Sequence, residues 1–96
     1  MIRVTVDFLG LPNAAKLAGA KAVPLALPGG TIADAISSLV AGRDARLGKL
    51  LLDGEGKLDL AFQVIRNGKE WLRREQLGLP LSDGDVLTIT MLVGGG

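Results

Sequence analysis

The 96-residue chain contains no cysteine, no histidine and no tyrosine, and its only aromatic residues are Phe8, Phe62 and Trp71. The absence of cysteine excludes disulfides, iron–sulfur clusters, thiolate zinc sites and cysteine nucleophiles. The absence of histidine removes the commonest general base and metal ligand. Three aromatic residues are too few to stack a run of nucleic-acid bases. Chemistry that depends on cysteine or histidine in this chain, and base stacking on an aromatic surface, are therefore excluded.

The chain also lacks an excess of either positive or negative charge. Lys and Arg number 11 against 10 Asp and Glu, a formal net charge of +1, which favours neither nucleic acid nor an anionic membrane as a partner. The longest charge-free stretch, residues 22–33, contains two prolines and two glycines, so it is no membrane span. The first residues alternate in polarity, unlike a signal peptide. The sequence predicts a cytoplasmic protein.

Hydrophobic periodicity predicts strands at both ends of the chain and a helix between them. Alternation indicates strands over residues 2–8, 22–27, 60–66, 69–72 and 86–93. Thr31 fits an N-cap with Asp34 in the capping-box position, and the apolar spacing continues the helix to Val40. Pro24 places the second strand at a sheet edge. Residues 10–20 are expected to be a loop or a weak helical turn.

Two shorter signals complete the pattern. Asp44 is expected to cap a short helix in which Leu47, Leu50 and Leu51 share one side. Asn67-Gly68 is a strong signal for a tight hairpin turn. Together these elements predict a single α+β domain over residues 1–96 with the β-grasp (ubiquitin-like) fold. We expect a mixed sheet of four to five strands with one main helix packed on one face.

Searches for a cofactor or metal site give little. No phosphate-binding glycine loop of the known spacings follows a predicted strand, so no nucleotide cofactor is expected. Asp83 and Asp85 form the one compact carboxylate pair. A hard cation needs six or more oxygen ligands and no further carboxylates follow, so we interpret the pair as turn residues that accept backbone N–H groups.

Two surfaces are candidates for binding a partner. Positive charge gathers around the second hairpin, which predicts either a solvated face or steering toward an acidic partner; the residues are Arg66, Lys69, Arg73 and Arg74. Ala61, Ile65 and Leu92 are expected on the sheet face away from the helix. There they form either an apolar patch for a partner or the floor of a second packed layer.

The chain ends in Gly94-Gly95-Gly96, directly after the last predicted strand. A frayed terminus is one interpretation. The alternative is a functional tail, because glycine is conformationally free and an enclosing cleft can hold it as bare backbone. Fully extended, three residues reach about 10 Å. We therefore expect residues 94–96 to be a flexible tail suited to delivering a terminal carboxylate into another protein's active site.

With this tail the chain resembles the MoaD/ThiS family of ubiquitin-like sulfur carriers. The resemblance lies in Asn67-Gly68, in the turn Leu81-Ser82-Asp83-Gly84-Asp85 and in the closing run 87–96. It departs from the family at Gly94, where many relatives have a small side chain, and at Met91-Leu92, where molybdopterin-type carriers often have prolines. Residues 10–20 match nothing in the family pattern.

The resemblance implies that Gly96 is the modified residue. A ubiquitin-activating-like partner enzyme would use ATP and magnesium to adenylate its carboxylate, and a sulfur donor protein would convert it to a thiocarboxylate. A sulfur-acceptor synthase would then take sulfide for molybdopterin, thiamin, cysteine or thiolated-tRNA biosynthesis. The chain itself would be neither an enzyme nor a cofactor binder. The predicted partner-binding residues are Ile65, Met91, Leu92, Val93, Gly94 and Gly95.

Two other functions stay open from the sequence. Adenylation of Gly96 also begins conjugation of a ubiquitin-like modifier to target lysines, and the tail alone does not separate the two outcomes. A non-catalytic β-grasp interaction module with an incidental glycine end is the third.

Overall fold

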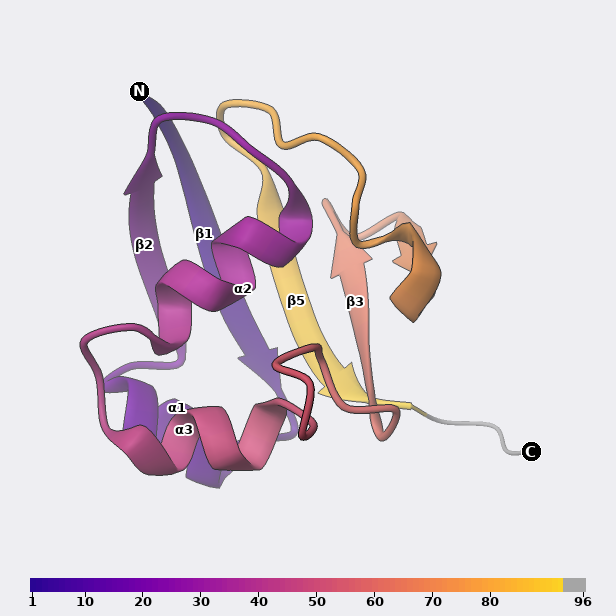
Figure 1. Cartoon of the computed structure of the whole chain (residues 1–96). Coiled ribbons are helices and arrows are strands. Elements are labelled where there is room, and N and C mark those ends of the chain that lie inside the picture. Colours follow the sequence, from indigo (N-terminus) through magenta and orange to yellow (C-terminus); the bar gives the residue numbers. More distant parts are fainter. Residues whose placement is uncertain (93–96) are drawn as a thin grey trace.

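A computed structural model of the chain describes residues 1–92, whose elements are shown in Figure 1. The strands are β1 (Ile2–Leu9), β2 (Ala22–Leu27), β3 (Phe62–Arg66), β4 (Glu70–Leu72) and β5 (Val86–Met91). The helices are α1 (Pro12–Ala18), α2 (Ile32–Val40) and α3 (Ala45–Leu51), with a 3-10 turn, η1 (Arg74–Gln76). No helix within residues 1–92 is both long and apolar enough to cross a membrane.

The five strands form one mixed sheet in the order β2-β1-β5-β3-β4. β1 is antiparallel to β2 and parallel to β5, while β3 is antiparallel to both β5 and β4. The strand from one end of the chain thus pairs with the strand from the other end at the centre of the sheet. This topology is the β-grasp fold and confirms the prediction from the sequence.

Helix α2 lies across one face of the sheet, where it contacts β1 and β2 (Figure 1). Its N-terminus has the predicted capping box: the Asp34 N–H donates to Thr31 Oγ1 (3.2 Å), and the Thr31 N–H donates to Asp34 Oδ2 (2.8 Å). Ile32, Ile36 and Leu39 are buried as the spacing predicted. The backbone chemistry of the cap therefore fixes where the main helix begins.

The other two helices differ in part from expectation. Residues 12–18 form a true helix, α1, with a proline in its first turn and Gly19 at φ +92° as its C-cap, rather than a loop or a weak turn. Ala14 is buried in the core, which stabilises this short segment. In α3, Leu47 and Leu51 are buried but Leu50 is 39% exposed. The expected shared side is wrong because residues 50 and 51 project about 100° apart around a helix.

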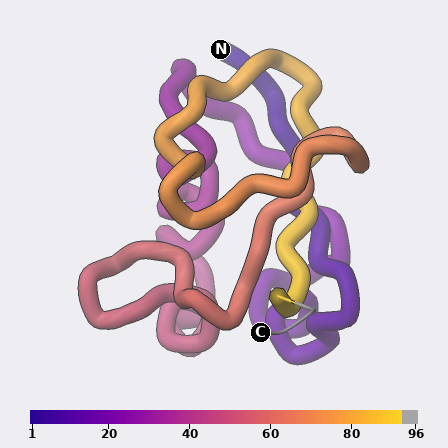
Figure 2. The backbone as a smooth tube through the Cα atoms, turned by 90° about the vertical axis from the view of Figure 1, so that its right-hand side faces the viewer, coloured from indigo at the N-terminus to yellow at the C-terminus, as the bar shows by residue number. Residues whose placement is uncertain are grey.

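The core lies between the sheet and the helices. The inward-facing strand residues form one buried cluster with residues of α2 and α3; they are Val4, Val6, Phe8, Leu87 and Ile89. Pro24 lies on the outermost strand β2, opposite Thr5, as predicted. β3 begins at Phe62, two residues later than expected, and β5 ends at Met91. In Figure 2, α2 and α3 lie on one side of the sheet, and the β3–β4 hairpin projects on the other.

Candidate functional site

The chain leaves the sheet at the end of its central strand, β5. Beyond Met91, the Leu92 N–H donates to the Ala61 carbonyl (2.7 Å), which ties the strand's last described residue to the segment before β3. The predicted site residues Val93, Gly94, Gly95 and Gly96 lie outside the described residues. The structure therefore fixes the root of the tail: β5 pairs with β1 up to Thr90 and with β3 up to Met91, and Leu92 is held by its hydrogen bond to Ala61.

Exposed apolar side chains gather at this root. Met91 is 47% exposed and pairs with Phe62, while Leu92 is 58% exposed. Leu92 also lines a hollow of about 270 Å³ together with Leu60, Phe62 and Arg73. Exposed leucine and methionine side chains clustered beside a shallow hollow are typical of a surface that another protein covers. Met91 and Leu92 thus lie where a docking partner would reach the tail.

The open face of the sheet, away from α2, has a continuous row of side chains. The strand registers place Asp7, Thr88, Ile65 and Trp71 side by side across β1, β5, β3 and β4. Ile65, a predicted contact residue, is only 8% exposed and forms the floor of this face. Trp71, at its edge, is 61% exposed. Ile65 therefore offers a partner little direct area, and Trp71 offers much more.

The sequence did not predict Trp71 as an exposed residue of this face. Leu72 is buried toward the core, so strand alternation turns its neighbour Trp71 to the open face. The signal that could have found it is the hairpin register, which sets Trp71 opposite Ile65. A two-residue Asn67-Gly68 loop would instead pair Ile65 with Glu70, so the sequence signal alone gives the wrong register, and the third loop residue, Lys69, turns Trp71 to the open face.

The Asn67-Gly68 turn and the turn over residues 81–85 are joined to each other by hydrogen bonds. Asn67 Nδ2 donates to Asp85 Oδ1 (3.0 Å), and the Val86 N–H donates to Asn67 Oδ1 (2.8 Å). The Ser82 N–H donates to Asp85 Oδ2 (2.8 Å). Asn67 has φ +54°, a left-handed conformation that asparagine tolerates better than most residues. The hairpin turn and the Asp-Gly-Asp turn therefore hold each other and set the start of β5.

Asp83 completes the second turn. Its Oδ1 accepts the Arg3 N–H (2.7 Å), and the Gly84 N–H donates to the Arg3 carbonyl (2.7 Å). Both carboxylates of the Asp83–Asp85 pair thus accept backbone N–H groups, which confirms their interpretation as turn residues. Within residues 1–92 no group of three or more acidic residues is arranged to hold a metal ion.

Two of the four cations around the hairpin are paired with acids. Arg66 Nε and Nη2 donate to the Glu70 carboxylate (2.9 Å each), and Nη1 donates to the Pro80 carbonyl (3.1 Å). The Arg66 hydrogen bonds lower the pKa of Glu70. Arg74 pairs with Asp53, whose pKa is lowered first by the backbone N–H groups of Lys57 and Glu55.

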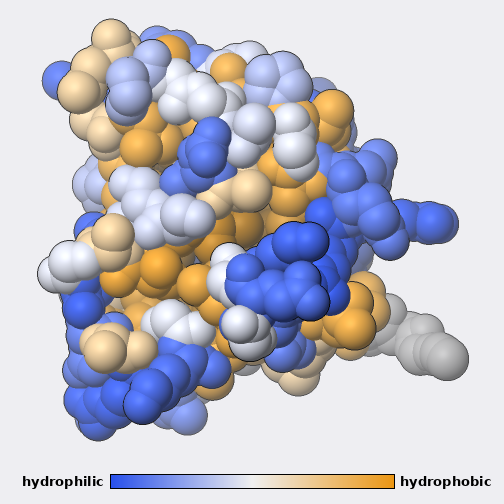
Figure 3. All heavy atoms as spheres, in the orientation of Figure 1, coloured by the Kyte–Doolittle hydropathy of each residue, from blue (hydrophilic) through white to orange (hydrophobic). Residues whose placement is uncertain are grey.

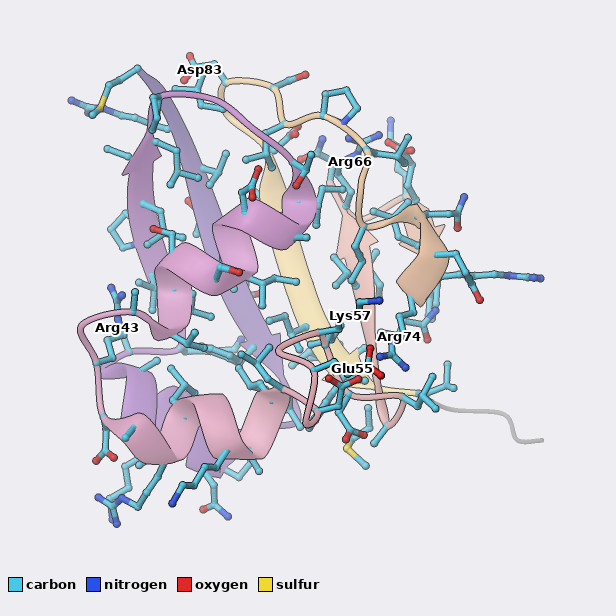
Figure 4. The ribbon with its side chains drawn as sticks, in the orientation of Figure 1. Arg43, Glu55, Lys57, Arg66, Arg74 and Asp83 are labelled. Atoms are coloured by element: carbon cyan, nitrogen blue, oxygen red, sulfur yellow. The ribbon has the colours of Figure 1, made fainter. Side chains whose placement is uncertain are left out.

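A second, larger hollow of about 530 Å³ lies on the helix side of the molecule (Figure 3). Its floor is apolar, from Ile36, Leu58 and Leu77, and Arg74 and Lys57 lie at its rim. Figure 4 shows Arg74, Lys57 and Glu55 close together there. Acidic and basic side chains are mixed at this rim, so it has no clear preference for a charged ligand.

A five-stranded β-grasp sheet whose central strand leads into a glycine-ended C-terminus defines a ubiquitin-like protein. No protein-family model matches the chain. It is 35% identical to small archaeal modifier protein 3 of Haloferax volcanii over 66 residues, which are 69% of this chain and 70% of that protein. The chain therefore belongs to the MoaD/ThiS-like family of ubiquitin-like small archaeal modifier proteins.

Solved structures agree with this assignment. SAMP1 of Haloferax volcanii has 26% sequence identity and a TM-score of 0.76, with 98% of this chain and 99% of that chain covered. A chain of the Amycolatopsis orientalis BexX/CysO complex has 29% identity and a TM-score of 0.66, with 97% and 99% covered. Proteins of this family are non-catalytic and act as sulfur carriers or as ubiquitin-like modifiers.

Proposed function

We propose that the protein is a sulfur carrier whose Gly96 carboxylate is adenylated by a partner enzyme and converted to a thiocarboxylate. The observation that carries the proposal is the position of the glycine end. β5 is held at the centre of the sheet up to Met91, Leu92 is hydrogen-bonded to Ala61, and the three glycines follow within the next four residues. A firmly held root followed by residues without side chains fits delivery of a carboxylate into a narrow cleft.

The chemistry needs little from the chain itself. A Gly96 carboxylate oxygen attacks the α-phosphate of ATP, pyrophosphate leaves, and an acyl adenylate forms. Hydrosulfide supplied by the sulfur donor protein then attacks the acyl carbon, AMP leaves with the electron pair of the acyl C–O bond, and loss of the S–H proton gives the thiocarboxylate. ATP and magnesium belong to the activating partner, which also stabilises the developing charge. The absence of histidine and cysteine is therefore compatible with this role.

We assign partner docking to the tail root. Leu92 supplies exposed apolar area in the 270 Å³ hollow, the exposed Met91 precedes it in the chain, and Ile65 supports the open face from below. Val93, Gly94 and Gly95 would then run through the partner's cleft. The BexX/CysO complex supports the idea that such proteins bind enzymes. Because the chemistry consumes ATP, we place it in the cytoplasm, with an activating enzyme, a sulfur donor and a sulfur-acceptor synthase as partners.

Conjugation to proteins is the second candidate. The 35% identical relative is named a modifier protein, which favours isopeptide formation between Gly96 and a target lysine. Both routes share the acyl adenylate and differ in the nucleophile that follows it. Molybdopterin, thiamin, cysteine and tRNA thiolation are the acceptor pathways that a thiocarboxylate here would serve.

The test is intact-mass analysis of the protein purified from its own cells, beside a variant that lacks Gly96. Sulfur carriage predicts a species in which one oxygen is replaced by sulfur, and this species must be missing from the variant. Conjugation predicts higher-mass adducts linked through Gly96 and no sulfur exchange. If the variant and the natural chain give the same spectra apart from the missing glycine, neither route operates.

A further inference from the structure

The strongest unassigned feature is the outer edge of the β3–β4 hairpin. β4 is the outermost strand of the sheet and is only three residues long. Its middle residue, Trp71, is 61% exposed, although Ile65 opposite it is nearly covered. Tryptophan is among the residues most enriched at the centres of protein interfaces. A solvent-facing tryptophan on a sheet edge is therefore a candidate anchor for a partner.

Two cations flank this tryptophan. Lys69, in the hairpin turn, precedes it by two residues, Arg73, just beyond β4, follows it by two residues, and both are exposed. Arg73 has an extended backbone (φ −80°, ψ 161°), so strand alternation keeps it on the side of Trp71. Within residues 1–92 neither Lys69 nor Arg73 forms an ion pair.

Glu70, the acidic residue between Lys69 and Trp71, points to the opposite face of the sheet from Trp71. Glu70 is held by Arg66, which also donates to the Pro80 carbonyl on the core side of the sheet. The fold thus divides the four cations predicted around the hairpin into two that form ion pairs and two that do not within residues 1–92. Arg66 and Arg74 are neutralised by Glu70 and Asp53, and what is left is a cation–aromatic–cation strip along β4.

We infer that the strip Lys69–Trp71–Arg73 binds an acidic segment of a partner protein. The matching segment is extended, with carboxylates four residues apart and an apolar side chain between them. Two residues of extended chain span about 6.5–7 Å, so a segment that lies along β4 with its apolar residue over Trp71 carries one carboxylate toward the hairpin turn with Lys69 and the other toward Arg73. An outermost strand also accepts a further strand by backbone pairing. This inference goes beyond the proposed function and does not depend on the tail.

A single-stranded nucleic acid fits the strip less well. Nucleic-acid platforms stack successive bases on several aromatic residues, whereas Trp71 is the only tryptophan and the chain has no tyrosine. Asp7 lies on the same sheet face, in one row with Thr88 and Ile65, and repels phosphate. The net charge of +1 adds little attraction. The observations therefore favour an acidic protein segment.

The test uses the full chain and a capped pentapeptide, Glu-Thr-Leu-Thr-Glu, with Lys-Thr-Leu-Thr-Lys as its charge-reversed control. Trp71 fluorescence reports contact directly because no other tryptophan is present. Backbone amide NMR shifts locate the contact. We expect saturable binding of the glutamate peptide, with shifts at residues 65 and 69–73, and much weaker binding of the lysine peptide.

Matched variants separate the strip from general charge. The double variant Lys69→Gln/Arg73→Gln should bind the glutamate peptide roughly 2- to 30-fold more weakly, the range for two exposed charge contacts. Lys16→Gln/Lys49→Gln removes the same charge from exposed positions on α1 and α3 and should leave binding unchanged. No binding of the glutamate peptide, equal binding of both peptides, equal loss in both double variants, or a larger response to a fifteen-nucleotide oligo(dT) would each overturn the inference. None of these results bears on adenylation of Gly96.

Discussion

Asp85→Ala should destabilise the protein through the unit that joins its two turns. Asp85 is only 6% exposed, and its carboxylate accepts from Asn67 Nδ2 (3.0 Å) and the Ser82 N–H (2.8 Å). A hydrogen bond to a charged group contributes about 1.5–3 kcal/mol, but both donors belong to exposed residues that water can reach. We therefore expect a loss of about 2–3 kcal/mol for the pair, not the full sum.

The assay is urea unfolding followed by far-UV circular dichroism, with thermal melts beside it. For a domain of this size the loss corresponds to a fall in Tm of roughly 8–24 °C. The urea midpoint should fall with little change in slope, because the surface exposed on unfolding stays the same. Asp83→Ala is the matched control: its carboxylate is exposed and accepts one N–H, from Arg3 (2.7 Å). It should cost less than about 1 kcal/mol. Equal losses in the two variants would refute the role given to Asp85.

Three further predictions separate core, turn and tail. Leu39→Ala removes a fully buried α2 side chain and should cost about 2–5 kcal/mol by urea titration, whereas deletion of Gly96 should change the free energy of unfolding by less than about 0.5 kcal/mol; equal losses would contradict this division. Asn67→Ala forces a left-handed alanine and removes the acceptor for the Val86 N–H, and in a double-mutant cycle with Asp85→Ala the two losses should be non-additive by about 0.5–3 kcal/mol; strict additivity would show that the turns are independent. The free energy of unfolding should be constant near neutral pH and fall as the pH drops below about 4. Hydrogen bonds lower the pKa of Glu70 and Asp53 and lower that of Asp44 to about 2, and carboxylates with a lowered pKa stabilise the fold above their unfolded pKa. Urea midpoints that rise on acidification would contradict this sign.

Much of the fold could be predicted because its signals are local. The Thr31–Asp34 capping box, the alternation in β1 and β5, and Pro24 in an edge strand each act within a few residues. The Asn67-Gly68 turn is also local, since both residues have the positive φ that the hairpin signal predicted. The loop, however, has three residues and not two, because Arg66 pairs with Glu70 and Lys69 lies in the turn. Local conformational preferences of this kind agree with the global fold and can be identified without tertiary contacts.

Features that depend on distant partners could not be predicted. Arg74 is paired with Asp53, which lies 21 residues away in the chain, so its neutralisation has no signal in the hairpin sequence. The segment 12–18 is helical partly because Ala14 is buried against the core. The weak hydrophobic periodicity of this segment does not predict that contact. Ile65 and Trp71 differ in exposure because one lies inside the sheet and the other at its edge.

The central claim, that the Gly96 carboxylate is the reactive group, is tested most directly by ATP–pyrophosphate exchange with a ubiquitin-activating-like enzyme from the same organism. Exchange of labelled pyrophosphate into ATP measures formation of the acyl adenylate, before sulfur transfer and conjugation diverge. The account predicts exchange that depends on added protein, saturates with its concentration and disappears when Gly96 is deleted. Undiminished exchange with the deleted chain would contradict it.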